Sequence, residues 1–403
     1  MLRIMKSKRQ LFVFTSKRIA CWAKCFAGLA FFFGALVCGG AEQPRPWPLW
    51  EAYAQHFTDG QGRVIDRSAD DRTTSEGQAY AMFFALVDND RIHFDKLLNW
   101  TEANLAGGDL SLRLPAWKWG RQASGAWTIL DDNSASDADL WMAYDLLEAG
   151  RLWHEPRYAK LGGQLASRIA QQEIIQVEGV GTWLAPGRRG FHPTADSYVV
   201  NPSYMPLPLL ERFAHVAPSG PWKAVATSLP ALLAPAVGGG FAMDWVAVGK
   251  AGIQATTPPG EVAAGRPAPQ PGGSYEAIRV YLWAGMTEPA TPGRRTVLSL
   301  LTGMKGVVDR TGTPAEQVSV AGSVIRAESP IGFSAAVLPY INALGDRNAA
   351  TKLAQRLRAA VDVQTGLIGN APTYYDQNLS LFSTGYTERR FHFGRDGQLS
   401  VSW

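Results

Sequence analysis

Apolar residues recur at helical spacing along most of the chain. Between residues 91 and 105, Phe94, Leu97, Leu98 and Leu105 follow one another at intervals that place them on one face of a helix. Comparable patterns predict helices over residues 78–87, 91–105, 138–149, 157–172, 203–214, 221–233, 275–284, 292–305, 333–343, 348–361 and 377–386. Short strands are expected only around residues 174–180 and in the tail from residue 390.

This succession of elements indicates an all-α fold. No alternation of strands with helices supports a parallel α/β sheet. Roughly twelve helices joined by loops rich in Pro and Gly are typical of two concentric helical layers. We therefore predict an α/α barrel with short strands in its loops and tail.

The first 41 residues differ from the rest of the chain. They contain seven basic residues, the first acid is Glu42, and a short apolar run over residues 25–38 precedes the small residues at 39–41. This order is typical of a secretory signal peptide, and the run is too short for a membrane span of ~20 residues. A retained anchor and lipid attachment at Cys38 remain alternatives, although Val37 disfavours the second.

Removal of this leader changes the charge and cysteine content. The whole chain carries +4, but residues 42–403 have 32 basic and 35 acidic residues, a net charge of −3. The basic balance therefore does not indicate a nucleic-acid partner. All three cysteines lie in the leader, and the 6 histidines show no metal-binding spacing, so we expect no disulfide, metal or cofactor.

Residues 42–403 are long enough for two domains, but we predict one. The best candidate for a linker is the stretch 256–273, which is rich in Pro, Gly and Ala. It could join two domains or form a long loop within one. We favour the loop, because an acidic segment that follows it directly has to lie near two others.

Three segments place an acid where a helix is expected to begin. They are TTSEGQ with Glu76, SASDADLW with Asp137, and GSYEAIR with Glu276. A helical barrel could bring these helix starts to one rim, which would gather several carboxylates around one cleft. Paired carboxylates are what the hydrolysis of a glycosidic bond requires. The segments therefore favour a polysaccharide hydrolase.

Glu76 and Asp137 each have a purely structural alternative. Thr73 and Glu76 have the spacing of a capping box, and Asp137 and Asp139 could simply complement the helix dipole. A proton donor at position 76 would need a raised pKa despite the helix dipole, and we expect Asp137 to supply that effect. Asp137 and Asp139 cannot share a helix face, so at most one of them points into a cleft.

Glu276 is followed three residues later by Arg279. The two could form a surface ion pair of little energetic value. Alternatively, Arg279 could hold Glu276 in its ionised form, as a general base requires. The spacing alone does not separate these two interpretations.

Aromatic residues indicate where a sugar could bind. Trp117 and Trp119 lie two residues apart in a turn-like segment, so one ring could be buried while the other faces a cleft and stacks on a glucose unit. Tyr204 and Tyr275 could serve in the same way. Other rings lie in helical stripes and are expected in the core, namely Trp100, Trp141 and Trp153.

The three acidic segments together resemble glycoside hydrolase family 8. The resemblance is carried by TTSEGQAYAMF, NSASDADLWMAYDLLEAGRLW and SYEAIRVYLWAGM, and it is supported by LPAWKWG, NPSYMP and GFSAAVLPY. It extends from about Trp47 to the end of the chain. Within the family, the sequence is similar to the periplasmic endoglucanases that are encoded with bacterial cellulose synthases.

The resemblance implies an (α/α)6 barrel that hydrolyses β-1,4-glucan with inversion at the anomeric carbon. It implies that Glu76 is the proton donor, that Asp137 has a catalytic role, and that position 276 holds the general base. Relatives carry Asp there, whereas this chain has Glu276. The extra methylene moves the carboxylate by roughly 1.5 Å, a displacement that can cost about 100-fold in rate. Three interpretations of the Glu at position 276 stay open: the cleft is adjusted to the longer side chain, the enzyme is slow, or Glu276 is a weakened base.

The resemblance also implies the setting. We expect a cellulose chain as substrate, contact with a cellulose synthase complex, and a periplasmic or secreted location. A monomer is the default, and nothing in the sequence indicates an oligomer. Two other functions are kept as alternatives, namely a glucan-binding subunit without catalysis and a polysaccharide lyase, whose uronic acid substrates would require basic residues or Tyr around the cleft.

Overall fold

The computed structural model describes residues 46–236, 238–260 and 270–403. These residues belong to one compact unit, Pro44–Trp403. The predicted leader lies outside the described residues. The proposed linker lies partly outside them, but the strands on either side of it belong to this same unit. Within the described part of the chain, no helix is both long enough and apolar enough to span a membrane.

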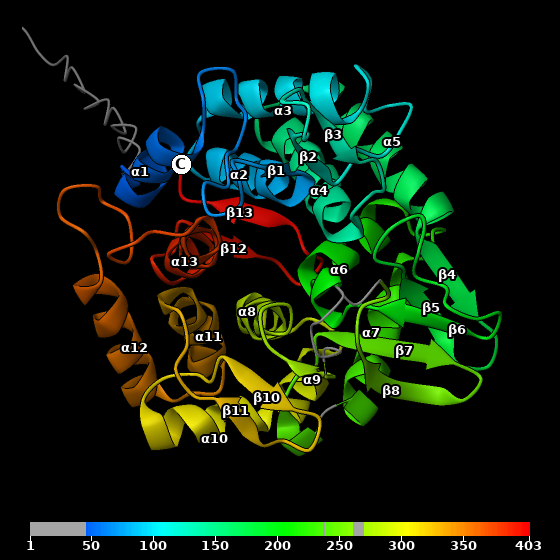
Figure 1. The fold of residues 1–403 in the computed structure, drawn as a ribbon, viewed down its shortest axis with the longest axis vertical. Coiled ribbons are helices and arrows are strands. Elements are labelled where there is room, and N and C mark those ends of the chain that lie inside the picture. The colour runs from blue at the N-terminus through cyan, green and yellow to red at the C-terminus, as the bar shows by residue number, and fades with distance from the viewer. Residues whose placement is uncertain (1–45, 237, 261–269) are drawn as a thin grey trace, which may run out of the picture. The chain divides into compact units, whose positions relative to one another are not determined.

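The helices alternate along the chain between an inner and an outer ring (Figure 1). Each inner helix contacts the next, and the last contacts the first, which closes the ring. The inner helices are α2 (Ser75–Val87), α4 (Ser136–Leu152), α6 (Leu207–Val216), α8 (Ile278–Met286), α11 (Ile331–Ala343) and α13 (Tyr374–Thr387). The outer ring consists of α1 (Pro48–Phe57), α3 (Arg91–Leu105), α5 (Pro156–Gln172), α7 (Trp222–Ala236), α9 (Arg294–Leu300), α10 (Thr302–Thr311) and α12 (Arg347–Ala359). The predicted all-α barrel is confirmed.

The inner helices are apolar on nearly every face because they are surrounded by other helices. In α2, every residue from Gly77 to Val87 is buried. The centre of the ring is aromatic: Phe382 of α13 lies 5.3 Å from Phe83 and 4.9 Å from Trp141, measured between ring centroids. These rings hold the inner helices at fixed positions, and therefore also fix the ends of those helices.

The strands form small antiparallel sheets between the helices. The strand predicted around residue 174 and those of the tail are confirmed, whereas the strands of the other three sheets were not predicted. The sheets are β1 (Thr73–Thr74), β2 (Lys118–Arg121) and β3 (Trp127–Asp131); β4 (Ile174–Val177) and β5 (Gly181–Leu184); β6 (Ser197–Val200), β7 (Trp245–Gly249) and β8 (Gly252–Thr256); β9 (Gly272–Gly273), β10 (Gln317–Ser319) and β11 (Val324–Arg326); and β12 (Phe391–Phe393) and β13 (Leu399–Val401).

Several predicted helix boundaries were wrong. The helix expected over residues 292–305 is two helices, α9 and α10, which meet at Leu301. The helix expected from residue 203 is a short 3-10 turn, Pro202–Tyr204, and α6 begins only at Leu207. Pro206 explains the break, because the residue before a proline is disfavoured in the helical conformation. Helix α1 was not predicted at all.

The C-terminal tail closes one end of the barrel. The Tyr144 hydroxyl donates to the Gly397 carbonyl at 2.8 Å, and the Leu399 amide donates to Glu148 at 3.0 Å. Gly397 has a positive φ of 73°, and a Cβ there would lie only 1.8 Å from the Pro208 carbonyl oxygen, so only glycine fits. Tyr144 and Glu148 lie well beyond the first turn of α4, so these contacts leave that turn free.

Candidate active site

Glu76 is the second residue of α2, at the end of the barrel where α2, α4 and α8 begin. The Thr74 hydroxyl caps the helix by accepting the Gly77 amide at 3.2 Å. The capping box with Thr73 is therefore wrong, because Thr73 lies in β1 and pairs with Trp119. A Cβ at position 77 would lie 2.6 Å from the Tyr374 hydroxyl, so glycine beside Glu76 allows α13 to pack closely here.

Asp137 is the second residue of α4 and lies at the same end. The Ala138 amide donates to its Oδ1 atom at 2.8 Å, and the start of α4 is held by a hydrogen bond from the Ser136 amide to the Pro186 carbonyl. Asp139 is fully buried and interacts with Glu173 instead. As predicted, only one of the two acids of this segment faces the cleft.

Glu276 lies in a turn and not in a helix, because α8 begins two residues later, at Ile278. The prediction of a helix start at this acid was wrong. The turn is held by Asp244, whose Oδ1 accepts the amides of Ser274 at 2.7 Å and Ala277 at 2.8 Å. These bonds come from a distant segment, which explains why local sequence did not reveal the turn.

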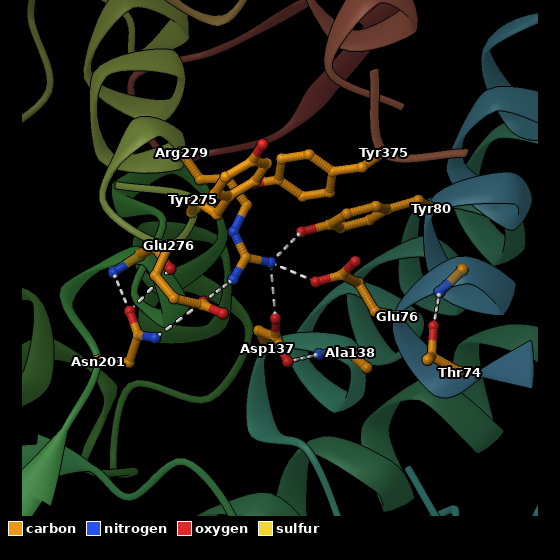
Figure 2. A network of polar contacts seen from close by, with 12 residues as sticks. Thr74, Glu76, Tyr80, Asp137, Ala138, Asn201, Tyr275, Glu276, Arg279 and Tyr375 are labelled. Carbon is orange, nitrogen blue, oxygen red and sulfur yellow. Dashed lines mark hydrogen bonds and ion pairs between the residues drawn. The ribbon is translucent and has the colours of Figure 1, made fainter. Parts of the chain in front are cut away.

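Arg279 joins all three acids (Figure 2). One guanidinium nitrogen donates to Glu76, to Asp137 at 3.0 Å and to the Tyr80 hydroxyl at 3.1 Å, and the other donates to Glu276. The Arg279 side chain is only 2 % exposed. The interpretation of Arg279 and Glu276 as a surface ion pair is therefore wrong, because this cation is buried among three carboxylates.

The shared guanidinium limits how far apart the outer two acids can be. Glu76 and Glu276 bind different nitrogen atoms of Arg279, so their bonded oxygens lie at most about 8 Å apart if each hydrogen bond has a length of about 2.9 Å. An inverting glycosidase needs a separation of roughly 6.5–9.5 Å. That separation stays a prediction for this pair.

The electrostatics of the cleft favour a proton on Glu76. Burial is the largest cause that raises the pKa of Glu76 to about 7, and the neighbouring carboxylates of Asp137 and Glu276 raise it further, while Arg279 lowers it. Asp137 thus contributes as expected, but burial contributes more. Burial also raises the pKa of Asp137, and Arg279 opposes this. A group with a pKa near neutrality can donate a proton under ordinary conditions.

The acids lie in a cleft of about 340 Å³. Three of the four predicted aromatic residues line it, namely Trp117, Tyr204 and Tyr275. Trp119 instead packs outside, with its ring 5.0 Å from Trp127 and 5.4 Å from Trp100. As expected for this pair, one ring faces the cleft and the other does not. Trp117 lies just before β2, and the pairing of β2 with β3 is irregular between Lys118 and Trp119, so the regular alternation of a strand does not place the two rings on one face.

Further residues of the cleft were not predicted. The Tyr375 hydroxyl donates to the Tyr275 carbonyl at 2.5 Å, and the two rings form one wall. Other lining residues come from the loop before α2 and from the start of α13, namely Asp66, Ser68, Arg72 and Tyr374. The first three lie in RVIDRSADDRTTSEGQ, residues 63–78, which ends in the first acidic segment, so the family resemblance of that region was a signal for them. Among the described residues, no cluster of His, Cys, Asp and Glu could hold a metal ion.

Comparison with known proteins places this arrangement in a family. The chain is 43% identical over 382 residues to an endoglucanase of Xanthomonas axonopodis pv. citri (strain 306), covering 94% of this chain and 96% of that protein. It is 40% identical over 359 residues to an endoglucanase of Escherichia coli (strain K12), covering 89% and 91% respectively. The crystal structure of endo-1,4-D-glucanase from Vibrio fischeri ES114 superposes with a TM-score of 0.80 at 39% identity, covering 89% of this chain and 99% of that one.

The sequence model of the glycosyl hydrolases family 8 matches residues 26–389, which include all three acids. The fold, the order of the acidic segments and the relatives agree with this match. The chain belongs to glycosyl hydrolase family 8 and is a glycoside hydrolase.

Proposed function

We propose that this enzyme cleaves internal β-1,4 bonds of cellulose and related glucans with inversion of the anomeric configuration. The observation that supports this most directly is the gathering of Glu76, Asp137 and Glu276 around Arg279 in one open cleft. The relatives named as endoglucanases support the substrate class.

In the proposed reaction, Glu76 gives its proton to the glycosidic oxygen as the bond from that oxygen to the anomeric carbon breaks. Glu276 takes one proton from a water molecule, whose oxygen bonds to the anomeric carbon from the opposite face. One water is consumed, and the sugar chain leaves as two shorter chains. The two acids exchange their protonation states, and solvent restores them.

Arg279 supports this division of roles. Its charge lowers the pKa of Asp137 against the effect of burial, which favours a carboxylate at that position. Asp137 can then stabilise the positive charge that develops on the sugar ring. Because the same guanidinium binds Glu276, it also holds the proposed base on the side of the cleft opposite Glu76.

Proton NMR of the first products from cellohexaose tests the proposal. Inversion predicts that the new reducing ends appear first as the α-anomer. A first product in the β-form would contradict inversion. Unsaturated products that absorb ultraviolet light would indicate a lyase, and binding without cleavage would indicate a glucan-binding protein.

The pH dependence of activity follows from the raised pKa of Glu76. A proton donor works only while protonated, so kcat/KM is expected to fall as the pH rises above about 7. If Glu76 had the ordinary pKa of 4.5, kcat/KM would begin to fall more than two pH units lower. Hydrolysis of a 2,4-dinitrophenyl cellotrioside is the control, because its leaving group needs no proton and its rate should persist to higher pH. Equal profiles for the two substrates would contradict the assignment.

Exchange of each tryptophan of the LPAWKWG segment should separate binding from stability. Trp117→Ala removes a ring that lines the cleft, so we expect KM for cellohexaose to rise about tenfold, or about 1.4 kcal/mol. Trp119→Ala removes a ring packed on Trp100 and should destabilise the fold by about 3 kcal/mol with little change in KM. Steady-state kinetics and urea unfolding measure the two effects. A reversed pattern would exclude sugar binding at Trp117.

We also propose that the enzyme acts in the periplasm during bacterial cellulose production, after removal of the leader. The basic and apolar composition of residues 1–41 supports export, and the resemblance to endoglucanases of cellulose synthesis supports the role. Contact with a cellulose synthase complex would bring the cleft to the emerging chain. Fractionation of cells that express the full chain, followed by N-terminal sequencing, tests export and cleavage.

A further inference from the structure

Asn201 lies next to the proposed base on the side away from Glu76. It immediately precedes the 3-10 turn Pro202–Tyr204 and is fully buried. Its Nδ2 atom donates to Glu276 at 2.9 Å (Figure 2). Neither the helical periodicity nor the acidic segments pointed to this residue.

The orientation of the Asn201 amide is determined by two donors. Its Oδ1 atom accepts the backbone amide of Ser203 at 2.9 Å and the Ser203 hydroxyl at 2.8 Å. A backbone amide can only donate, so the oxygen of Asn201 has to face Ser203. The Nδ2 group is thereby left to face Glu276, and it offers that carboxylate a donor that cannot itself lose a proton.

The contact is suited to a glutamate at position 276. Glu276 has one more rotatable bond than the aspartate of the resembling sequences, and its side chain is 31 % exposed, so it needs support to keep one orientation. Arg279 and Asn201 both bind its Oε2 atom, from different elements. Together they fix the longer side chain, which indicates a cleft adjusted to glutamate.

We propose that Asn201 is a positioning residue that holds Glu276 in the orientation needed to activate water. This inference rests on the proposed role of Glu276 as general base. Asn201 acts through Glu276 and needs no contact with the sugar.

Other titratable or charged residues also surround Glu276, and a substitution of Asn201 leaves all of them in the sequence. They come from the helices and loops that form the cleft, namely Arg279, Glu76, Asp137, Tyr204, Asp244 and Tyr375. A shift of the pH profile after a change at position 201 therefore reports the altered neighbour of Glu276.

The variant Asn201→Asp tests the proposal because it is nearly isosteric. It keeps an oxygen for both donors of Ser203, and it replaces only the donor to Glu276 with a second carboxylate oxygen. We expect kcat on cellohexaose to fall about 10- to 100-fold and the acidic limb of the pH–rate profile to move up by about one pH unit. KM should change little, whereas the melting temperature is expected to fall because the new acid is buried next to another one.

Stimulation of the Asn201→Asp variant by azide distinguishes the positioning of Glu276 from a purely structural role of Asn201. Azide attacks the anomeric carbon without losing a proton, so it needs no base, while Glu76 still protonates the leaving oxygen. We expect azide to raise turnover of Asn201→Asp, with a glycosyl azide as product, and to affect the unmodified enzyme little. A lack of azide stimulation would overturn the proposal even if kcat had fallen.

The matched control is Asn104→Asp. Asn104 lies in the outer helix α3, and its Nδ2 donates to the Trp100 carbonyl at 2.9 Å, so the chemical change is the same far from the cleft. This control should keep its rate and pH profile. An Asn201→Asp enzyme with kcat within about twofold of the original and an unmoved acidic limb would refute positioning. Full activity of Glu276→Gln would instead refute the proposed base, whatever the result at Asn201.

Discussion

Replacement of Glu76 by Gln is expected to lower kcat on cellohexaose about 1,000-fold, because the leaving oxygen loses its proton donor. The glutamine has nearly the same shape, so substrate binding should change little. Initial rates from reducing-end assays measure the effect. The matched control is Glu51→Gln, which changes an exposed acid in the first turn of the outer helix α1.

The choice of leaving group sharpens this test. A 2,4-dinitrophenolate leaves without protonation, so Glu76→Gln should cleave the corresponding cellotrioside almost as fast as the original enzyme does. A loss of equal size on both substrates would indicate a disturbed cleft and not a missing acid. Retention of more than a tenth of the activity on cellohexaose would remove Glu76 from the mechanism.

Replacement of Arg279 by Ala is expected to lower the free energy of unfolding by about 3–5 kcal/mol at pH 7, because three acids would lose their common buried counter-charge. Activity should fall with it, since Asp137 loses the charge that lowers its pKa and Glu276 loses a hydrogen-bond donor that positions it. Urea unfolding measures the stability. Arg279→Lys is the control: it keeps the charge but cannot bind the acids with two nitrogens, so its loss should be smaller.

The stability loss should depend on pH in a defined direction. Burial raises the folded-state pKa of Glu76 and Asp137, and Arg279 lowers both, so its removal raises them further. The folded variant then holds protons that the unfolded chain has released, and its stability falls as the pH rises from about 4.5 through 7. The difference in the free energy of unfolding between the Arg279→Ala variant and the original enzyme should therefore be smaller at pH 5 than at pH 7. An equal difference at both values would contradict this account.

The sequence alone was sufficient to predict the barrel and its acids. Helical periodicity is visible within single segments such as α3, because an outer helix buries one face along its length. The starts of α2 and α4 were also close to their predicted places; the Thr74 side chain caps α2, whereas α4 begins at Ser136 without a side-chain cap. Glu76 and Asp137 could be identified as candidates for this reason, whereas Glu276 was identified by a helix start that lies two residues further on in the structure. The family resemblance then assigned a role to each acid.

What decided the chemistry lies between segments far apart in the chain. Arg279 is 203 residues from Glu76 and 142 from Asp137, and its contact with both depends on how the closed ring places α8 relative to α2 and α4. The turn that carries Glu276 depends in the same way on Asp244, and the orientation of Glu276 on Asn201. Spacing along the chain defines the face of one helix, but only the packed ring determines which faces meet, how deeply an acid is buried, and which acid therefore keeps its proton.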